Sequence, residues 1–513
     1  MPNRKNSSRS SIILKNTLTN YLQFAIKLLI TFITLPIIIR YLGVERYGLW
    51  GLTMSMVGFL TTLDLGFGTS ITKYVAETKG EGDTERRNRI VSSIFSVYLA
   101  ISVAVILIVA IAAQFYGDIF DLPDHLLYEA KWALILIGIR VALNFPFSVY
   151  RGILFGQQRI ALLNSIEITV NIVEAVVVIT TLYYGYGIIG YATIYLISYL
   201  IKASLRLFFA YRETKNLHVT PRLFQREKLW EVTSFSLYAF MTVSAAAVAI
   251  QMDFIIIKLF DSLAAVAIYS VAIRVSRHVI RMARKFLNVL VPLIAELKGA
   301  GDRESIRRVM LEGTKLSLLI VTPTTIALLY FCSDLITYWV GEEFAESAQI
   351  LTVFLITVFP TVIRTNAGNI LNMSGHHRFA ARATIVGAII NVTLSVILIH
   401  FFGLIGVAFG TFVAISLVQL AVVDKVCRIY QISISDLLKR SVLPILPPMI
   451  PALSGVWVLN RLFPPTNLFW VVVYMGIEVL IYVLFMYFFS FSQSERYRYG
   501  KKLKRFVRRN HQE

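Results

Sequence analysis

The amino-acid sequence predicts an all-α polytopic membrane protein. Of its 513 residues, 57% are hydrophobic and only 16% are charged, against about 25% charged residues in an average soluble domain. The mean hydropathy is +0.68. Apolar runs of about 20 residues, the length that crosses a bilayer core, recur along the whole chain. This composition excludes a soluble globular enzyme, a disordered chain and a collagen-like fibre.

The apolar runs predict about 14 transmembrane helices, each long enough to span the bilayer and several long enough to tilt. Only short polar or basic segments separate them, so no loop could hold a folded catalytic domain. The predicted spans are residues 17–39, 48–74, 90–114, 130–150, 160–183, 188–210, 232–259, 264–295, 309–331, 347–371, 383–402, 404–424, 441–460 and 468–490.

The charge distribution predicts the orientation in the membrane. The chain has 50 Lys and Arg residues against 30 Asp and Glu residues, a net charge of +20. Lys and Arg gather in cytoplasmic loops, which explains the excess without a nucleic-acid partner. The predicted inner segments are basic at 79–89, 211–231 and 491–513, whereas the outer ones are acidic around Asp118 and Glu342. We therefore expect a multi-pass protein of the cytoplasmic membrane with both termini in the cytoplasm.

The chain also repeats itself. Three pairs of segments align in order at nearly one offset, and the longest pair is identical at eight of 15 positions. The pairs are 75–89 with 294–308 at offset 219, Gly156–Arg159 with Gly375–Arg378 at offset 219, and Gly187–Gly190 with Gly403–Gly406 at offset 216. Each repeat contains six predicted spans, an even number, so both halves enter the membrane in the same direction.

This repeat predicts two pseudo-symmetric six-helix lobes followed by two extra C-terminal helices. A central cleft between such lobes suits alternating access, in which one lobe rocks against the other. The predicted parts are a cytoplasmic N-terminus at 1–16, an N-lobe at 17–210, a cytoplasmic linker at 211–231, a C-lobe at 232–424, helices 13 and 14 within 441–490, and a basic cytoplasmic tail at 491–513.

The eighth predicted span carries basic side chains along one helical face. They occupy relative positions 0, 3, 4, 7, 10 and 11: Arg274, Arg277, His278, Arg281, Arg284 and Lys285. A charged side chain at the bilayer centre costs about 2.5–3.5 kcal/mol, so this face must line a hydrated cavity or be paired. The alternative is a cytoplasmic amphipathic helix. The repeat argues against it, because offset 219 aligns these residues with the second predicted span.

Guanidinium groups in a cavity favour an anionic ligand. Arginine binds phosphate oxygens bidentately, which makes phosphate or pyrophosphate the best match. Lys27, Arg140 and Arg364, from three other spans, could join the same surface. For Lys27 the alternative is a side chain that reaches back to the interface, and for Arg364 it is a position near that interface.

Four acidic residues in predicted spans are candidates for ion coupling. They are Asp64, Glu167, Glu174 and Asp253. A cation-coupled carrier needs carboxylates that can bind H⁺ or Na⁺, and acids inside a membrane commonly mark such pathways. The alternative is that these carboxylates form ion pairs with the arginines.

No motif in the sequence indicates an enzyme. The P-loop, H-E-x-x-H and G-x-S-x-G patterns are missing, and so is an Asp-rich metal motif. The two cysteines, Cys332 and Cys427, fall on opposite predicted membrane faces and cannot pair. We therefore expect no catalytic residue, no metal site, no cofactor and no disulfide.

Three motifs near the N-terminus resemble those of a known family. In order they are Tyr41-Leu-Gly-Val-Glu-Arg-Tyr-Gly48, Leu63-Asp-Leu-Gly-Phe-Gly68 and Lys73-Tyr-Val-Ala-Glu77. They resemble the polysaccharide transporter, or O-antigen flippase, branch of the multidrug/oligosaccharidyl-lipid/polysaccharide exporter superfamily. The architecture of two six-helix lobes and two extra helices extends the resemblance over essentially the whole chain.

The resemblance implies a flippase for polyprenyl-pyrophosphate-linked oligosaccharides in polysaccharide or O-antigen biosynthesis. Its implied partners are the lipid-linked oligosaccharide, membrane lipids, H⁺ or Na⁺ as the driving ion, and polysaccharide polymerase machinery. Two alternatives stay open. One is a cation-coupled multidrug exporter of the same superfamily, which would need an acidic or aromatic cavity. The other is a membrane-embedded glycan polymerase or ligase, which would need a large outer loop or a metal site.

Overall fold

The predicted all-α polytopic fold is confirmed. The computed structural model describes residues 3–491, 493 and 495–496, so most of the predicted basic tail at 491–513 lies outside the described residues. Within them the chain forms helices and no strand. Twelve of these helices are long and apolar enough to cross a membrane. The predicted count of about 14 differs at two places, the second span and the pair at 383–424.

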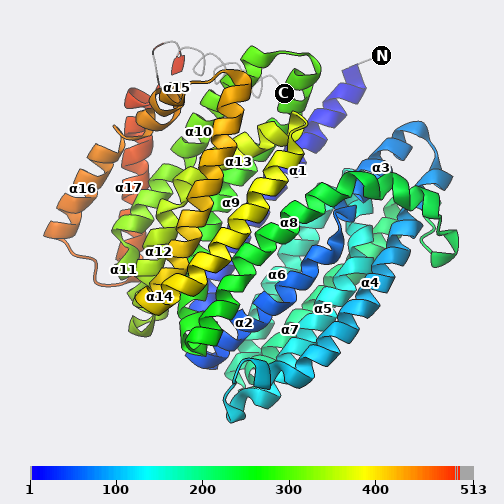
Figure 1. Ribbon diagram of the computed structural model, residues 1–513, viewed down its shortest axis with the longest axis horizontal. Coiled ribbons are helices and arrows are strands. Elements are labelled where there is room, and N and C mark those ends of the chain that lie inside the picture. Colours follow the sequence, from blue (N-terminus) through cyan, green and yellow to red (C-terminus); the bar gives the residue numbers. More distant parts are fainter. Residues whose placement is uncertain (1–2, 492, 494, 497–513) are drawn as a thin grey trace. The chain divides into compact units, whose positions relative to one another are not determined.

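The described chain divides into two compact units, Met1–Ala267 and Ile268–Glu513. In the first unit α4 and α5 run side by side, α5 also packs on α7, and α1 packs on α6 (Figure 1). The elements of this unit are α1 (Asn3–Leu42), α2 (Val44–Leu60), η1 (Thr61–Asp64), α3 (Phe67–Glu81), α4 (Thr84–Ile119), α5 (Asp124–Gly156), α6 (Ile160–Tyr183), α7 (Gly187–Glu213), η2 (Pro221–Leu223) and α8 (Arg226–Phe260).

In the second unit α10 packs on α13 and α17, and α16 packs on α17. Helix α9 begins at the end of the first unit and continues into this one. The elements are α9 (Leu263–Gly299), α10 (Arg303–Tyr330), α11 (Cys332–Val340), η3 (Glu342–Phe344), α12 (Glu346–Ile356), α13 (Val358–Met373), α14 (His377–Tyr430), α15 (Ile434–Leu437), η4 (Leu438–Val442), η5 (Leu443–Ile445), α16 (Met449–Leu462) and α17 (Leu468–Phe489).

The units divide at a different place from the lobes that the repeat predicts. The predicted C-lobe begins at residue 232, inside α8, yet α8 belongs to the first compact unit. The reason is packing: the Ser55 hydroxyl of α2 donates to the Gln251 carbonyl of α8 at 2.6 Å. The repeat reflects similarity between two segments of the sequence, whereas the units reflect which helices pack together.

The prediction of one continuous second span at 48–74 is wrong. The chain forms α2, then the short 3-10 helix η1, then α3. Leu65 and Gly66 separate the last two with φ angles of 52° and 76°. A left-handed backbone cannot continue a right-handed helix, so two consecutive residues in this conformation break the span.

The pair of spans predicted at 383–402 and 404–424 falls within α14. Gly403 interrupts its helical backbone with a φ of 58°. Its partner in the repeat, Gly187, has a φ of 57°. Glycine is the residue that reaches positive φ at little cost, so this repeated pair shares one backbone geometry.

The loops at 75–89 and 294–308 likewise fold alike. Gly82 and Gly301 have φ angles of 75° and 71°. The next residue in each loop caps the following helix: the Asp83 carboxylate accepts from the Arg86 amide at 2.8 Å, and Asp302 accepts from the Ser305 amide at 2.9 Å. Hydrogen bonds from the Ser305 hydroxyl and the Ser305 amide hold the pKa of the Asp302 carboxyl below its ordinary value. Local structure thus supports the longest predicted repeat.

The predicted alignment of Gly156 with Gly375 needs a correction of two residues. Gly375 has a φ of 83°, and the residue that occupies the same place after α5 is Gln158, with a φ of 63°. The amides of Gln158 and Gly375 donate to Phe155 and Asn372, each three residues back. Aligning the two glycines gave the wrong offset, because the residue with the left-handed backbone in the first repeat is Gln158 and not a glycine.

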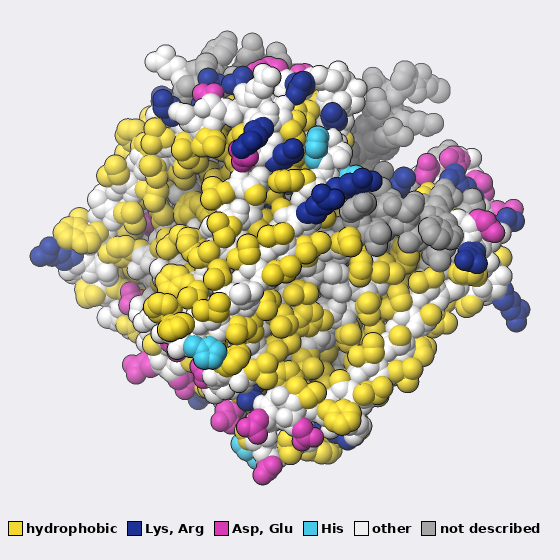
Figure 2. Space-filling view, in the orientation of Figure 1, with side chains coloured by type: hydrophobic (Ala, Val, Ile, Leu, Met, Phe, Trp, Pro, Cys, Tyr) yellow, Lys and Arg dark blue, Asp and Glu magenta, His cyan; other side chains and the backbone are white. Residues whose placement is uncertain are grey.

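Apolar side chains cover the outward faces of the spans. Along α4 they include Val103, Leu107, Ile111 and Phe115, each more than half exposed. Figure 2 shows apolar side chains in yellow over much of the visible surface. Such a surface is stable against lipid tails and would be a liability in water. The chain is therefore a multi-pass membrane protein.

The first family motif has a packing role. Gly43 precedes α2 with a φ of 78°, and Arg46 forms a two-pronged ion pair with Glu129 of α5 at 2.7 and 3.0 Å. A Cβ atom on Gly48 would lie 1.8 Å from the carbonyl oxygen of Leu263. Only glycine lets the two backbones approach this closely.

We therefore predict that Gly48→Ala destabilises the fold by about 1–3 kcal/mol, the usual cost of overpacking a well-packed site. The clash is with backbone, which cannot rotate away. The measurement is the thermal unfolding midpoint of purified protein in detergent. Gly476→Ala is the matched control, since a Cβ there meets no atom within 4 Å. Equal midpoints for the two variants would contradict the prediction.

Candidate functional site

Helix α9 has an apolar face and a basic face. Its buried positions include Val271, Val279, Ala283 and Leu287, at helical spacing. The six predicted basic residues lie on the same continuous helix, Leu263–Gly299. Because buried apolar residues fix the rotation of the helix, the cations are directed away from the packed side.

The cations of α9 differ in exposure. Arg274, Arg277, His278 and Lys285 are half-buried, whereas Arg281 and Arg284 are exposed. The Arg281 Nε atom donates to the carbonyl oxygen of Arg277 at 3.2 Å. In the described part of the chain, neither Arg281 nor Arg284 forms an ion pair with a carboxylate. Two exposed guanidinium groups are thus available to an anion.

Arg364 of α13, which the sequence proposed for the same surface, lies near these cations. Arg364 is close enough to Arg284 for their charges to repel each other, and Arg281 is likewise affected by the charge of Arg274. The Arg364 guanidinium donates to the Thr384 hydroxyl of α14 at 3.1 Å. Like charges repel, so gathering them in one region is unfavourable unless a ligand or water compensates them. We call Arg274, Arg277, His278, Arg281, Arg284, Lys285 and Arg364 the basic cluster.

The other two predicted cations belong to the first unit. Lys27 is exposed on α1, in keeping with a side chain that reaches an interface. Arg140 of α5 lies over the rings of Tyr195 and Tyr199 of α7, at 4.0 and 5.2 Å from their centroids. A guanidinium over two aromatic faces gains cation–π stabilisation, so Arg140 also has a packing role.

Two of the four predicted acids pair with basic residues of α7. Glu174 of α6 binds the Lys202 ammonium at 2.7 Å, and Glu167 pairs with Arg206. Lys202 also donates to the Asn171 side chain at 2.7 Å. The sequence left pairing with the arginines open as an alternative, but Lys202 and Arg206 were not among its candidate cations. Lys202 and Arg206 were missed, although their spacing of four residues on one helix was readable.

The remaining two acids occupy different surroundings. Asp64 ends η1 at the break between α2 and α3, and the Tyr98 hydroxyl of α4 donates to its carboxylate. Broken helices inside a membrane are where transporters bind ions, because their unsatisfied backbone groups can act as ligands. Asp253 of α8 is buried, with 1% of its surface exposed.

Sequence reasoning also missed Glu478. It is the one charged residue in α17, Leu468–Phe489, and is fully buried. Neither of its carboxyl oxygens has a hydrogen-bond partner among the described residues. An ionisable group in such a place is a functional candidate by default, because keeping it there is costly. A single Glu in an otherwise apolar span is the signal that could have found it.

Comparison with known proteins gives the family. The family model for "Polysaccharide biosynthesis protein" matches residues 13–298, and the MatE model matches residues 235–397. The chain is 21% identical over 431 residues to a "Putative O-antigen transporter" of Shigella flexneri, covering 82% of this chain and 99% of that one. It is 26% identical over 160 residues to the "Probable low-salt glycan biosynthesis flippase Agl15" of Haloferax volcanii, covering 31% and 34%.

A solved structure has the same fold. The inward closed conformation of the lipid II flippase MurJ superposes with a TM-score of 0.72, covering 92% of this chain and 98% of that one at 17% identity. At this identity the likeness shows the fold alone. The relatives are named as transporters or flippases, so the family is of the transporter type rather than catalytic. The chain belongs to the polysaccharide biosynthesis family of the multidrug/oligosaccharidyl-lipid/polysaccharide exporter superfamily.

Proposed function

We propose that the protein is a flippase for a polyprenyl-pyrophosphate-linked oligosaccharide. It moves the sugar head group across the cytoplasmic membrane by alternating access, for polysaccharide or O-antigen biosynthesis. The family and the named activities of its relatives support a lipid-linked glycan as cargo. Both termini are proposed to lie in the cytoplasm, and the polysaccharide polymerase machinery is the proposed partner that receives the product.

The basic cluster is the observation that carries this proposal. A pyrophosphate bears several negative charges and non-bridging oxygens, which match the paired N–H groups of arginine. Arg281 and Arg284 are exposed and have no carboxylate partner in the described chain. The cluster can therefore hold the charged part of the lipid while its apolar tail stays in the bilayer.

We predict that Arg281→Gln/Arg284→Gln lowers transport at least tenfold. Each guanidinium supplies charge-assisted hydrogen bonds worth about 1.5–3 kcal/mol, and about 1.4 kcal/mol is a factor of ten. The measurement is surface glycan in cells that lack their own flippase, with membrane protein level determined in parallel. Both side chains are exposed, so the fold should survive.

Two companion variants sharpen this test. Arg281→Lys/Arg284→Lys keeps the charge but loses the bidentate geometry, so we expect intermediate transport. Arg428→Gln is the matched control, because Arg428 is an exposed arginine of the same unit that pairs with Asp424. Full surface glycan from the double Gln variant at normal protein level would refute a role for the basic cluster.

A multidrug exporter is the second candidate, favoured by the MatE match at 235–397. Organic cations would meet the positive potential of the basic cluster, which disfavours them. Drug-resistance profiling of an expressing strain separates the two functions. A glycan polymerase or ligase is a weaker candidate, and product formation by the purified protein on a labelled lipid-linked sugar would establish it.

Coupling to an H⁺ or Na⁺ gradient is a further part of the proposal. Asp64 is its best-supported carboxylate, because it lies at the break between α2 and α3. Asp64→Asn keeps an acceptor for the Tyr98 hydroxyl but cannot exchange a cation. We predict that this variant folds normally and that its transport in proteoliposomes no longer responds to an imposed ion gradient. An unchanged response to the gradient would exclude Asp64 as the coupling site.

Glu167 and Glu174 are instead proposed to hold α6 and α7 together. Glu174→Gln leaves the mostly buried Lys202 without its counter-ion, and breaking a buried pair costs about 3–5 kcal/mol. We predict a lower thermal midpoint for the single variant, with recovery of both midpoint and transport in Glu174→Gln/Lys202→Met. A double variant that is stable yet inactive would contradict a purely structural role for this ion pair.

A further inference from the structure

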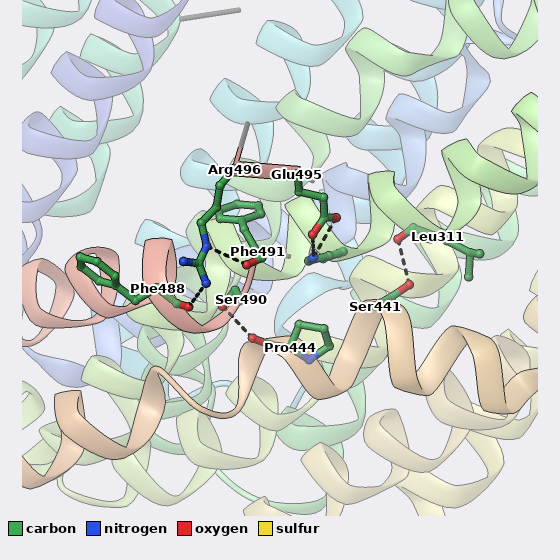
Figure 3. A network of polar contacts seen from close by, with 9 residues as sticks. Leu311, Ser441, Pro444, Phe488, Ser490, Phe491, Glu495 and Arg496 are labelled. Atoms are coloured by element: carbon green, nitrogen blue, oxygen red, sulfur yellow. Dashed lines mark hydrogen bonds and ion pairs between the residues drawn. The ribbon is translucent and has the colours of Figure 1, made fainter. Parts of the chain in front are cut away.

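A cavity outside the basic cluster has the features of a phosphate site. It lies within the second unit and has a volume of about 530 Å³. Its walls come from α10, from the segment η4–η5, and from the chain after α17 (Figure 3). Its charged lining residues are Arg308, Glu312, Lys315, Lys439, Arg440 and Glu495. The four cations outnumber the two carboxylates.

Hydrogen bonds join the segments that form the walls of the cavity. The Ser441 hydroxyl donates to the Leu311 carbonyl at 2.8 Å, which joins η4 to α10. The Ser490 hydroxyl donates to the Pro444 carbonyl at 2.7 Å, which joins the end of α17 to η5 (Figure 3). Residues Leu438–Val442 form a π-helical turn, a rare geometry found often at functional sites.

Lys315 is a buried cation in the wall of this cavity and holds a carboxylate. Its side chain is buried, yet its ammonium lies 3.0 and 2.9 Å from the two oxygens of Glu495. A buried lysine must be compensated by negative charge, and here the chain supplies it from the segment after α17. The Glu495 carboxylate thus occupies the place that two phosphate oxygens would take.

Exposed apolar side chains surround the charged residues of the cavity. The apolar span α17 ends at Phe489, a residue of the cavity wall that is 55% exposed. Leu443, also in the wall, is 56% exposed, and Leu438 beside it is 51% exposed. Exposed cations next to exposed apolar side chains match a ligand with a charged head and apolar tails, and basic pockets at the ends of spans are suited to anionic lipid head groups.

We propose that this cavity binds the phosphate of an anionic membrane phospholipid. Arg308, Lys439 and Arg440 contact the phosphate, and the acyl chains lie over Leu443 and Phe489. Glu495 competes with the phosphate for Lys315, so the Glu495 carboxylate leaves the Lys315 ammonium when the lipid binds. This site is separate from the basic cluster and does not depend on the proposed flippase activity.

The test is phospholipid binding to the purified full-length protein in detergent, counted by native mass spectrometry. We expect phosphatidylglycerol to bind at least tenfold more tightly than phosphatidylcholine. Lys439→Gln/Arg440→Gln should remove most of this preference. Arg461→Gln, an exposed arginine on α16 beside Trp457, is the matched control and should keep it. Equal binding of the two lipids to the unaltered protein would overturn the proposal.

For Glu495→Gln we predict a gain in lipid binding rather than a loss. Removing the competing carboxylate should tighten phosphatidylglycerol binding and enlarge the rise in thermal midpoint that this lipid causes. Weaker binding would contradict competition at Lys315. Displacement of the lipid by an equal concentration of sn-glycerol 3-phosphate would assign the cavity to a free phosphate and overturn the lipid assignment.

Discussion

The constraint on which this structure depends is the cost of a charged side chain inside a membrane. The chain meets that cost in different ways at different places. Between α6 and α7, the carboxylates Glu167 and Glu174 face Arg206 and Lys202, so each charge has a near counter-ion. On α9, Arg281 and Arg284 stay exposed without a carboxylate partner in the described chain. The ion pairs between α6 and α7 neutralise their own charges and hold the two helices together. The arginines of α9 need water or an anionic ligand to compensate their charge.

The family motifs also differ in whether packing alone explains their residues. Gly48 is fixed by a backbone contact with Leu263, and Arg46 by its ion pair with Glu129. Both features act within the packing of the first unit, so they preserve the fold whatever the cargo is. The motif around Asp64 is different, because it breaks a span and leaves a carboxylate at the break. A motif that interrupts regular structure inside a membrane is costly for the fold, and this cost is why Asp64 is a candidate for ion coupling.

Hydrophobic runs predicted the helices well because a span must satisfy all its backbone hydrogen bonds internally. They could not predict the break after Asp64, since Leu65 adopts the left-handed conformation without being glycine. The alignment of Gly156 with Gly375 failed for a related reason, because Gln158 fills the equivalent position. At the site, helical periodicity placed the cations on α9, but the partners of Glu167 and Glu174 on α7 depend on tertiary packing. Lys315 and Glu495 pair across a sequence separation of 180 residues, which no local pattern encodes.

The repeat finally shows where the two halves of the chain differ in structure. At offset 219, the break at Thr61–Gly66 corresponds to Ile280–Lys285 in the middle of α9. The first copy interrupts its helix there and holds an acid, whereas the second keeps a continuous helix and holds Arg281 and Arg284. Loop geometry at Gly82 and Gly301 stayed the same in both copies, so the backbone plan did not require this difference. Charges of opposite sign thus fall in matched segments but not at matched positions, since Asp64 aligns with Ala283, Arg281 with Thr62 and Arg284 with Leu65.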